Sequence, residues 1–196
     1  MNNEFAFILG NGETRKEFLI KDLLYKGKVF ACNRVYQESP PPHTLVSVDK
    51  DMAHEIQNSG YSSKNVHYTR ESNVIKNSGA LALHKKYFGY SSGPNCAALA
   101  ANENFPYIFL IGMDLHSLDP ERINNLYAGT KYYKQKTDKP QTFENWVKQI
   151  QDIIKEFPNQ RFIHVNPLLD FTPSEWALLS NFSVTTPNEF RLLINN

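Results

Sequence analysis

Six short runs of apolar, β-branched and aromatic residues recur along the 196-residue chain and alternate with segments of helical periodicity. Continuous apolar runs suit strands that are covered on both faces, as in a parallel sheet. The alternation therefore predicts an α/β fold over residues 1–196, with a Rossmann-like, doubly wound and mostly parallel sheet that carries helices on both faces. The predicted strands are residues 5–9, 28–32, 44–48, 65–69, 107–112 and 161–165.

Four segments between or after these strands carry helix signals. Residues 14–24 open with a T-x-x-E capping box, and residues 143–157 place apolar side chains at three- and four-residue intervals. Residues 172–175 and 186–189 each combine Thr at the cap, Pro in the first turn and Glu at the third position. These signals predict a helix at each place.

Ligands of doubly wound sheets bind beyond the carboxyl ends of the strands, so the residues after each predicted strand are candidates for a site. The first strand is followed by Gly10-Asn11-Gly12. Glycine permits close approach of a ligand to the backbone, and the N-terminus of a following helix attracts an anion. Arg15 replaces the third glycine of the dinucleotide fingerprint, and Asn33 replaces its acidic residue, so an NAD enzyme is not expected. A tight turn without a ligand is the alternative.

A second small polar loop, Ser91-Ser92-Gly93, precedes Pro94 at a predicted helix start. Its hydroxyls and N–H groups are suited to a phosphate or a carboxylate in the cleft. The alternative is that these residues only begin a helix and bind no ligand.

Asp114 and His116 follow the predicted strand 107–112 and are the candidate catalytic residues. A carboxylate there can accept from hydroxyls, hold a divalent ion or act as a base. Asp114 with His116 could also contribute to a divalent-metal site, but no further ligands occur at a diagnostic spacing.

The chain from 116 to 141 is a long polar connection rich in Tyr and Lys. Connections of this length are often functional lids, so we expect a mobile cover over the pocket. In this cover Tyr127, Tyr132 and Tyr133 are expected to stack on a sugar or base, and Lys131, Lys134 and Lys136 to meet a phosphate. A solvated excursion is the alternative.

Composition narrows the class of partner. A formal net charge of +1 provides no field to gather nucleic acid, and Cys32 and Cys96 are expected to be buried thiols. The chain has no basic region followed by a long apolar run, which predicts a soluble, cytoplasmic protein without a membrane span.

The order of the strand-end motifs resembles that of the bacterial sialyltransferases that use CMP-sialic acid. Their pattern of G-N-G, C-N, S-G-x-x-x-x-A and G-x-D corresponds here to "GNG" (10–12), "CNRVY" (32–36), "SSGPNCAALA" (91–100) and "IGMD" (111–114). The resemblance implies a CMP-type nucleotide-sugar as ligand and a glycosyltransferase-like activity. By this resemblance Asn11 and Asn33 contact the nucleotide-sugar, Ser91, Ser92 and Gly93 the phosphate or the sugar carboxylate, and Asp114 the ribose. The neighbouring residues Gly10, Gly12 and Arg34 are further candidate ligand residues.

The chain departs from this family where the catalytic base should lie, since the family's histidine comes later than His116. "LIGMDL" (110–115) also resembles 6-hydroxymethylpterin diphosphokinase-like proteins, which implies a metal-dependent phosphotransferase as an alternative. A non-catalytic nucleotide-binding module is the third hypothesis. The sequence contains no feature that indicates the oligomeric state.

Overall fold

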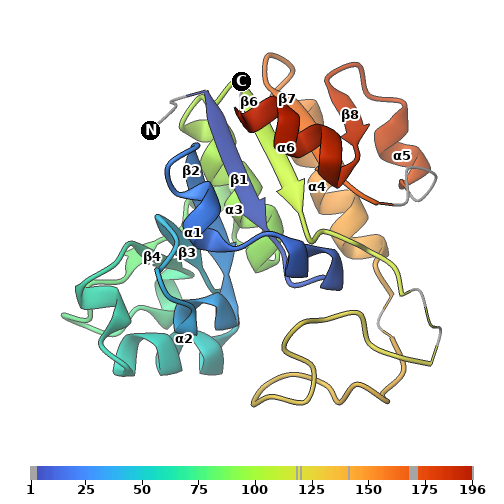
Figure 1. The fold of residues 1–196 in the computed structure, drawn as a ribbon. Coiled ribbons are helices and arrows are strands. Elements are labelled where there is room, and N and C mark those ends of the chain that lie inside the picture. Colours follow the sequence, from blue (N-terminus) through green and yellow to red (C-terminus); the bar gives the residue numbers. More distant parts are fainter. Residues whose placement is uncertain (1–3, 118, 120, 141, 168–171, 196) are drawn as a thin grey trace.

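The computed structural model describes residues 4–117, 119, 121–140, 142–167 and 172–195. Its strands are all parallel and form one sheet in the order β5-β4-β3-β2-β1-β6-β7-β8 (Figure 1). The strands are β1 (Phe5–Leu9), β2 (Lys28–Cys32), β3 (Thr44–Val46), β4 (His67–Thr69), β5 (Leu81–Ala82), β6 (Tyr107–Ile111), β7 (Arg161–Val165) and β8 (Phe182–Thr185).

Helices cover both faces of this sheet, so the predicted doubly wound α/β class is confirmed. The helices are α1 (Ile20–Leu23), α2 (Lys50–Asn58), α3 (Ser92–Asn102), α4 (Glu144–Glu156), α5 (Ser174–Ala177) and α6 (Pro187–Asn195). Short 3₁₀ turns lie at η1 (Glu13–Glu17), η2 (Asn33–Gln37), η3 (Tyr61–Ser63), η4 (Glu71–Asn73) and η5 (Lys85–Tyr87).

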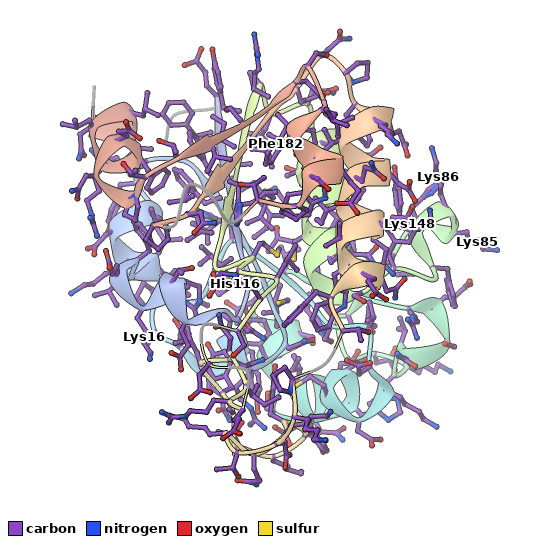
Figure 2. All side chains as sticks on the ribbon, turned by 90° about the vertical axis from the view of Figure 1, so that its right-hand side faces the viewer. Lys16, Lys85, Lys86, His116, Lys148 and Phe182 are labelled. Carbon is purple, nitrogen blue, oxygen red and sulfur yellow. The ribbon has the colours of Figure 1, made fainter. Side chains whose placement is uncertain are left out.

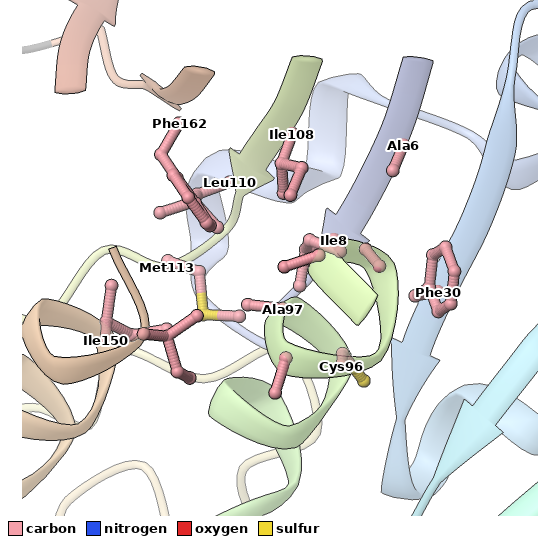
Figure 3. Packing of buried hydrophobic residues seen from close by; sticks show 14 of the residues in the cluster. Ala6, Ile8, Phe30, Cys96, Ala97, Ile108, Leu110, Met113, Ile150 and Phe162 are labelled. Atoms are coloured by element: carbon pink, nitrogen blue, oxygen red, sulfur yellow. The ribbon is translucent and has the colours of Figure 1, made fainter. Parts of the chain in front are cut away.

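The two faces bury alternate residues of the same strands, as the period of a strand requires. On β1, Ala6 and Ile8 pack with α3, α4 and α5, and Figure 3 shows this cluster around Ala97 and Met113. Phe7 and Leu9 point to the other face, where α1, α2 and α6 pack.

All six predicted strands are confirmed, with shorter bounds at β3, β4 and β6. The sequence analysis missed β5, whose two residues are exposed, and β8, in which Thr185 is the one buried residue. It also missed α2, in which Met52, Ala53 and Ile56 are the buried apolar residues. Such short or mostly polar elements give little periodic signal.

The expected single helix over residues 14–24 is wrong. The chain forms η1, passes through extended backbone at Phe18 and Leu19, and only then forms α1. Thr14 does not cap a helix, because its hydroxyl bonds to Asp114.

The other helix signals have mixed outcomes. At α6 the capping box is confirmed, since Thr186 Oγ1 accepts from the Glu189 N–H (3.2 Å) and a Glu189 carboxylate oxygen accepts from the Thr186 N–H (2.9 Å). The helix α4 is also confirmed. At α5 the cap position is Pro173, and no side chain caps the helix, so the Thr cap expected there is wrong.

The sheet order places a topological switch point between β1 and β6. The chain builds β2 to β5 on one side of β1 and then returns to build β6 to β8 on the other side. Connections diverge at the carboxyl ends of β1 and β6, where doubly wound folds bind ligands. Within the described residues, no helix is long and apolar enough to cross a membrane.

Candidate functional site

A cavity of about 470 Å³ opens at the carboxyl edge of the sheet, beyond β1, β2, β3, β4 and β6. Its size falls within the range of small-molecule sites. The strand-end residues that line it are Gly10, Asn11, Gly12, Asn33, Asp49, Arg70, Gly112, Met113 and Asp114. Ser91, Ser92 and Gly93 line it from the start of α3, so the strand ends and the serine loop meet at one place.

Gly10 and Gly12 let the loop after β1 pack directly on the loop after β6. A Cβ at Gly10 would lie 2.4 Å from the carbonyl oxygen of Gly112, and one at Gly12 would lie 2.4 Å from the Asp114 carboxylate. The N–H groups of Gly10 and Gly12 donate to Ile111 and Gly112 (both 2.8 Å). Both glycines also line the cavity, but close packing of two loops already requires them.

The Asp114 carboxylate is held by the first loop. It is 5% exposed, and it accepts from the N–H of Thr14 (3.1 Å) and from the Thr14 hydroxyl. His116 lies in the body of the molecule, away from the peripheral lysines Lys85 and Lys148 (Figure 2). Its Nδ1 is 2.5 Å from the carbonyl oxygen of Asp114. Of the two candidate catalytic residues, Asp114 lines the cavity and His116 is not among the described residues that do so.

Ser92 joins three parts of the cavity wall. Its hydroxyl accepts from the N–H of Val48 beyond β3 (3.1 Å) and donates to Oδ1 of Asn33 beyond β2 (3.0 Å). Asn33 has a φ of 55°, a left-handed conformation that Asn tolerates better than most residues. The side chains of Asn33 and Ser92 therefore hold the loops in register as well as facing the cavity.

The rest of the serine loop is supported by α4. Ser91 Oγ accepts from the indole N–H of Trp146 (2.9 Å), and the Ser91 N–H donates to Gln149 (2.9 Å). A Cβ at Gly93 would lie 3.0 Å from the end of the Met113 side chain. Trp146 and Phe143 also line the cavity, so the apolar stripe of this helix continues from the core into the site. The sequence analysis did not include residues of this helix among the candidate site residues.

The connection between β6 and α4 closes another side of the cavity. Its lining residues are Leu115, Ile123, Asn124, Asn125, Ala128, Tyr132, Tyr133, Lys134 and Pro140. It is tied to the first loop, because the Leu126 N–H donates to Asn11 O (2.8 Å) and Asn11 Nδ2 donates to the Tyr133 hydroxyl (3.1 Å). Part of this connection, residues 118, 120 and 141, lies outside the described residues. Its movement on ligand binding stays a prediction.

Two predicted ligand residues bond elsewhere and, among the described residues, do not line the cavity. The Tyr127 hydroxyl accepts from Arg15 (2.7 Å) and bonds to Glu38. Arg34 pairs with Glu55 (3.1 Å) and donates to the carbonyl oxygen of Lys131 (2.6 Å).

Arg15, which replaces the third fingerprint glycine, is buried and forms an ion pair with the partly exposed Glu38 (2.7 Å). Burial favours the neutral acid, but hydrogen bonds from Arg15 and Tyr127 outweigh it and lower the pKa of Glu38. This charged cluster fixes the connection to the loop after β1.

Two further groups limit the chemistry of the site. Cys32 lines the cavity, but burial raises its pKa to about 12, so the thiol stays protonated and is a poor nucleophile. His164, on β7, has its Nε2 3.0 Å from the carbonyl oxygen of Met113, and burial lowers its pKa to about 4. The neutral ring holds the loop that carries Asp114, a positioning role that a lone histidine in a predicted strand did not signal.

In the described part of the chain, no group of three or more His, Cys, Asp or Glu side chains is placed to hold a metal ion. Comparison with protein-family models, with curated proteins and with solved structures gives no match for this chain. The likeness to sialyltransferases therefore depends on the short motifs at the strand ends.

Proposed function

We propose that the protein binds a nucleotide-activated sugar in the cavity at the β1/β6 switch point and acts as a glycosyltransferase of the sialyltransferase type. The observation that carries this proposal is the convergence of Asn11, Asn33, Ser92 and Asp114 on one cavity. These are the residues that the motif resemblance assigns to the ligand, and they come from segments far apart in the sequence.

The cavity offers suitable chemistry for each part of such a ligand. The N–H groups of Ser92 and Gly93 belong to the first turn of α3, where the helix dipole favours a phosphate. Amide groups of Asn11 and Asn33 can bond to a base or a ribose, and Tyr132 and Trp146 provide apolar ring surface for a sugar or base.

Transfer would be a direct displacement at the sugar carbon, with the leaving phosphate stabilised by the loop N–H groups. The acceptor hydroxyl needs a base, and Asp114 is the candidate that lines the cavity. Asp114 has to release its contact with Thr14 before it can take a proton from the acceptor.

A non-catalytic nucleotide-binding module is the second candidate. It is favoured by the engagement of the Asp114 carboxylate with Thr14 and by the position of His116 outside the cavity lining. The metal-dependent phosphotransferase has less support, because the described residues contain no cluster of three metal-ligating side chains.

Thermal-shift measurements with CMP, CMP-N-acetylneuraminate and ATP, each with and without Mg²⁺, test the proposal. CMP and its sugar should raise the melting temperature without metal. Stabilisation by ATP only in the presence of Mg²⁺ would favour the phosphotransferase. Release of CMP from the sugar donor, monitored by chromatography, distinguishes a transferase from a binding module.

A blocked variant shows whether binding occurs in this cavity. Ala128→Trp adds a large ring to the lining, whereas Ala177→Trp adds the same ring to exposed α5. Stabilisation by CMP should disappear in the first variant and persist in the second. Equal stabilisation of both would place the nucleotide elsewhere.

A further inference from the structure

We propose that Arg70 is the anion-binding residue of the cavity, holding a phosphate or carboxylate oxygen pair of the ligand. This inference deepens the proposed function and rests on it for the identity of the ligand. The sequence analysis assigned no role to Arg70, which directly follows β4 and lines the cavity.

The charges around the cavity leave Arg70 available for a ligand. The charged residues of the lining are Asp49, Arg70, Asp114 and Lys134. Asp114 is engaged by Thr14, whereas Asp49 and Lys134 are exposed to solvent. Arg70 forms no ion pair with any other described residue.

The guanidinium of Arg70 is partly withdrawn from water. Its Nε is buried and has no hydrogen-bond partner within the described part of the chain. The ring of Phe88 lies 6.0 Å from the guanidinium carbon and supports the side chain from one side. A guanidinium without an ion-pair partner is costly to withdraw from water, and an oxyanion of the ligand would offset that cost with charge-assisted hydrogen bonds.

The backbone holds Arg70 in a fixed position. Its carbonyl oxygen accepts from the Asn73 N–H (2.8 Å), which closes the turn η4. The Asn73 side chain in turn donates to Val48 O (2.9 Å), on the loop that Ser92 also holds. Arg70 is thus anchored to the same loops as the predicted ligand residues.

The position of Arg70 in the sheet indicates how long the ligand is. Three strand-to-strand steps separate β4 from β1, which corresponds to about 14 Å at the usual spacing. A ligand that contacts both Arg70 and the loop after β1 is therefore elongated, as a nucleotide-sugar is. A guanidinium can bind a carboxylate or a phosphate through two parallel hydrogen bonds, so either anion fits.

Calorimetric titration of cytidine, CMP and CMP-N-acetylneuraminate into the wild-type protein, Arg70→Gln and Arg161→Gln tests the proposal. Arg161 is an exposed arginine at the amino end of β7, at the edge of the sheet away from the cavity. In the wild-type protein, addition of the phosphate, the acidic sugar or both should strengthen binding. In Arg70→Gln the gain in affinity from one of these groups should be about tenfold to hundredfold smaller than in the wild type. In Arg161→Gln both gains should be unchanged.

The gain that Arg70→Gln removes identifies the anion. Loss at the step from cytidine to CMP assigns Arg70 to the phosphate, and loss at the step to CMP-N-acetylneuraminate assigns it to the sugar carboxylate. Arg70→Lys retains the charge without the two-pronged geometry and should recover part of the affinity. An Arg70→Gln protein that binds all three compounds as the wild type does would overturn the proposal.

Inorganic phosphate separates failure of this inference from failure of the proposed function. It needs no nucleotide site, and it should raise the melting temperature of the wild-type protein more than that of Arg70→Gln. Equal stabilisation of the two proteins overturns the role of Arg70. Absence of binding by all three cytidine compounds overturns only the proposed nucleotide function.

Discussion

Ser92→Ala removes a hydroxyl that joins three segments of the cavity wall. In the folded protein this hydroxyl accepts from the N–H of Val48 and donates to Asn33 Oδ1. Ser92 is 5% exposed and Val48 is 3% exposed, so water has limited access to the groups that the substitution leaves unpaired.

The expected cost follows from those two partners. A buried donor left without a partner costs roughly 1 to 3 kcal/mol, and the Val48 N–H is such a donor. Asn33 is partly exposed, so its oxygen can bond to water instead and adds little. We therefore expect Ser92→Ala to lower the free energy of unfolding by about 1 to 3 kcal/mol, or the melting temperature by roughly 2 to 12 °C for a chain of this size.

Urea unfolding measures this change, and Ser91→Ala is the matched control. Ser91 accepts from the Trp146 indole, but it holds no buried backbone donor, so its loss should cost under about 1 kcal/mol. CMP affinity is measured on the same proteins. An unchanged free energy of unfolding in Ser92→Ala, together with a tenfold loss of CMP affinity, would refute the structural role and support the ligand role implied by the motif.

Three further predictions concern other parts of the structure. Gly12→Ala places a Cβ 2.4 Å from the Asp114 carboxylate and should destabilise the protein by roughly 1 to 3 kcal/mol. A Cβ at Gly89 would have no atom within 4 Å, so Gly89→Ala should change stability little, and equal effects of the two substitutions in urea unfolding would contradict the packing argument. Burial lowers the pKa of His67 and of His164 to about 4. Below about pH 6.5 these two histidines are therefore protonated in the unfolded chain while they stay neutral in the folded protein, and the free energy of unfolding should fall by roughly 4 kcal/mol from pH 7 to pH 5. A free energy of unfolding that does not change over this pH range would refute this. The ion pair between Glu55 and Lys131 (2.8 Å) ties the connection between β6 and α4 to α2. Glu55→Gln weakens this ion pair, so trypsin should cut the connection faster, and CMP should slow the cutting; the same rate in the wild type would show that this ion pair does not hold it.

The fold class and the position of the cavity could be predicted because both depend on a repeated pattern. The central strands β1, β2 and β6 are apolar runs, and each is followed by a small polar segment. Parallel strands present their carboxyl ends at one edge, so Asn11, Asn33 and Asp114 converge without any knowledge of the tertiary contacts. The short edge strand β5 could not be found this way, since neither Leu81 nor Ala82 is buried.

The roles of individual atoms could not be predicted, because contacts between residues distant in sequence decide them. Thr14 and Glu17 have the letters of a capping box, yet the Thr14 hydroxyl bonds to Asp114, 100 residues away. The same contact engages the carboxylate that appeared available for catalysis and explains why Gly12 cannot carry a side chain. Arg70 is the converse case, because an arginine after a strand carries no motif. Its lack of an ion-pair partner among the described residues emerges only from the contacts of the folded chain. A local pattern therefore indicates where a site forms, while the pairing of its charges determines which side chains remain for a ligand.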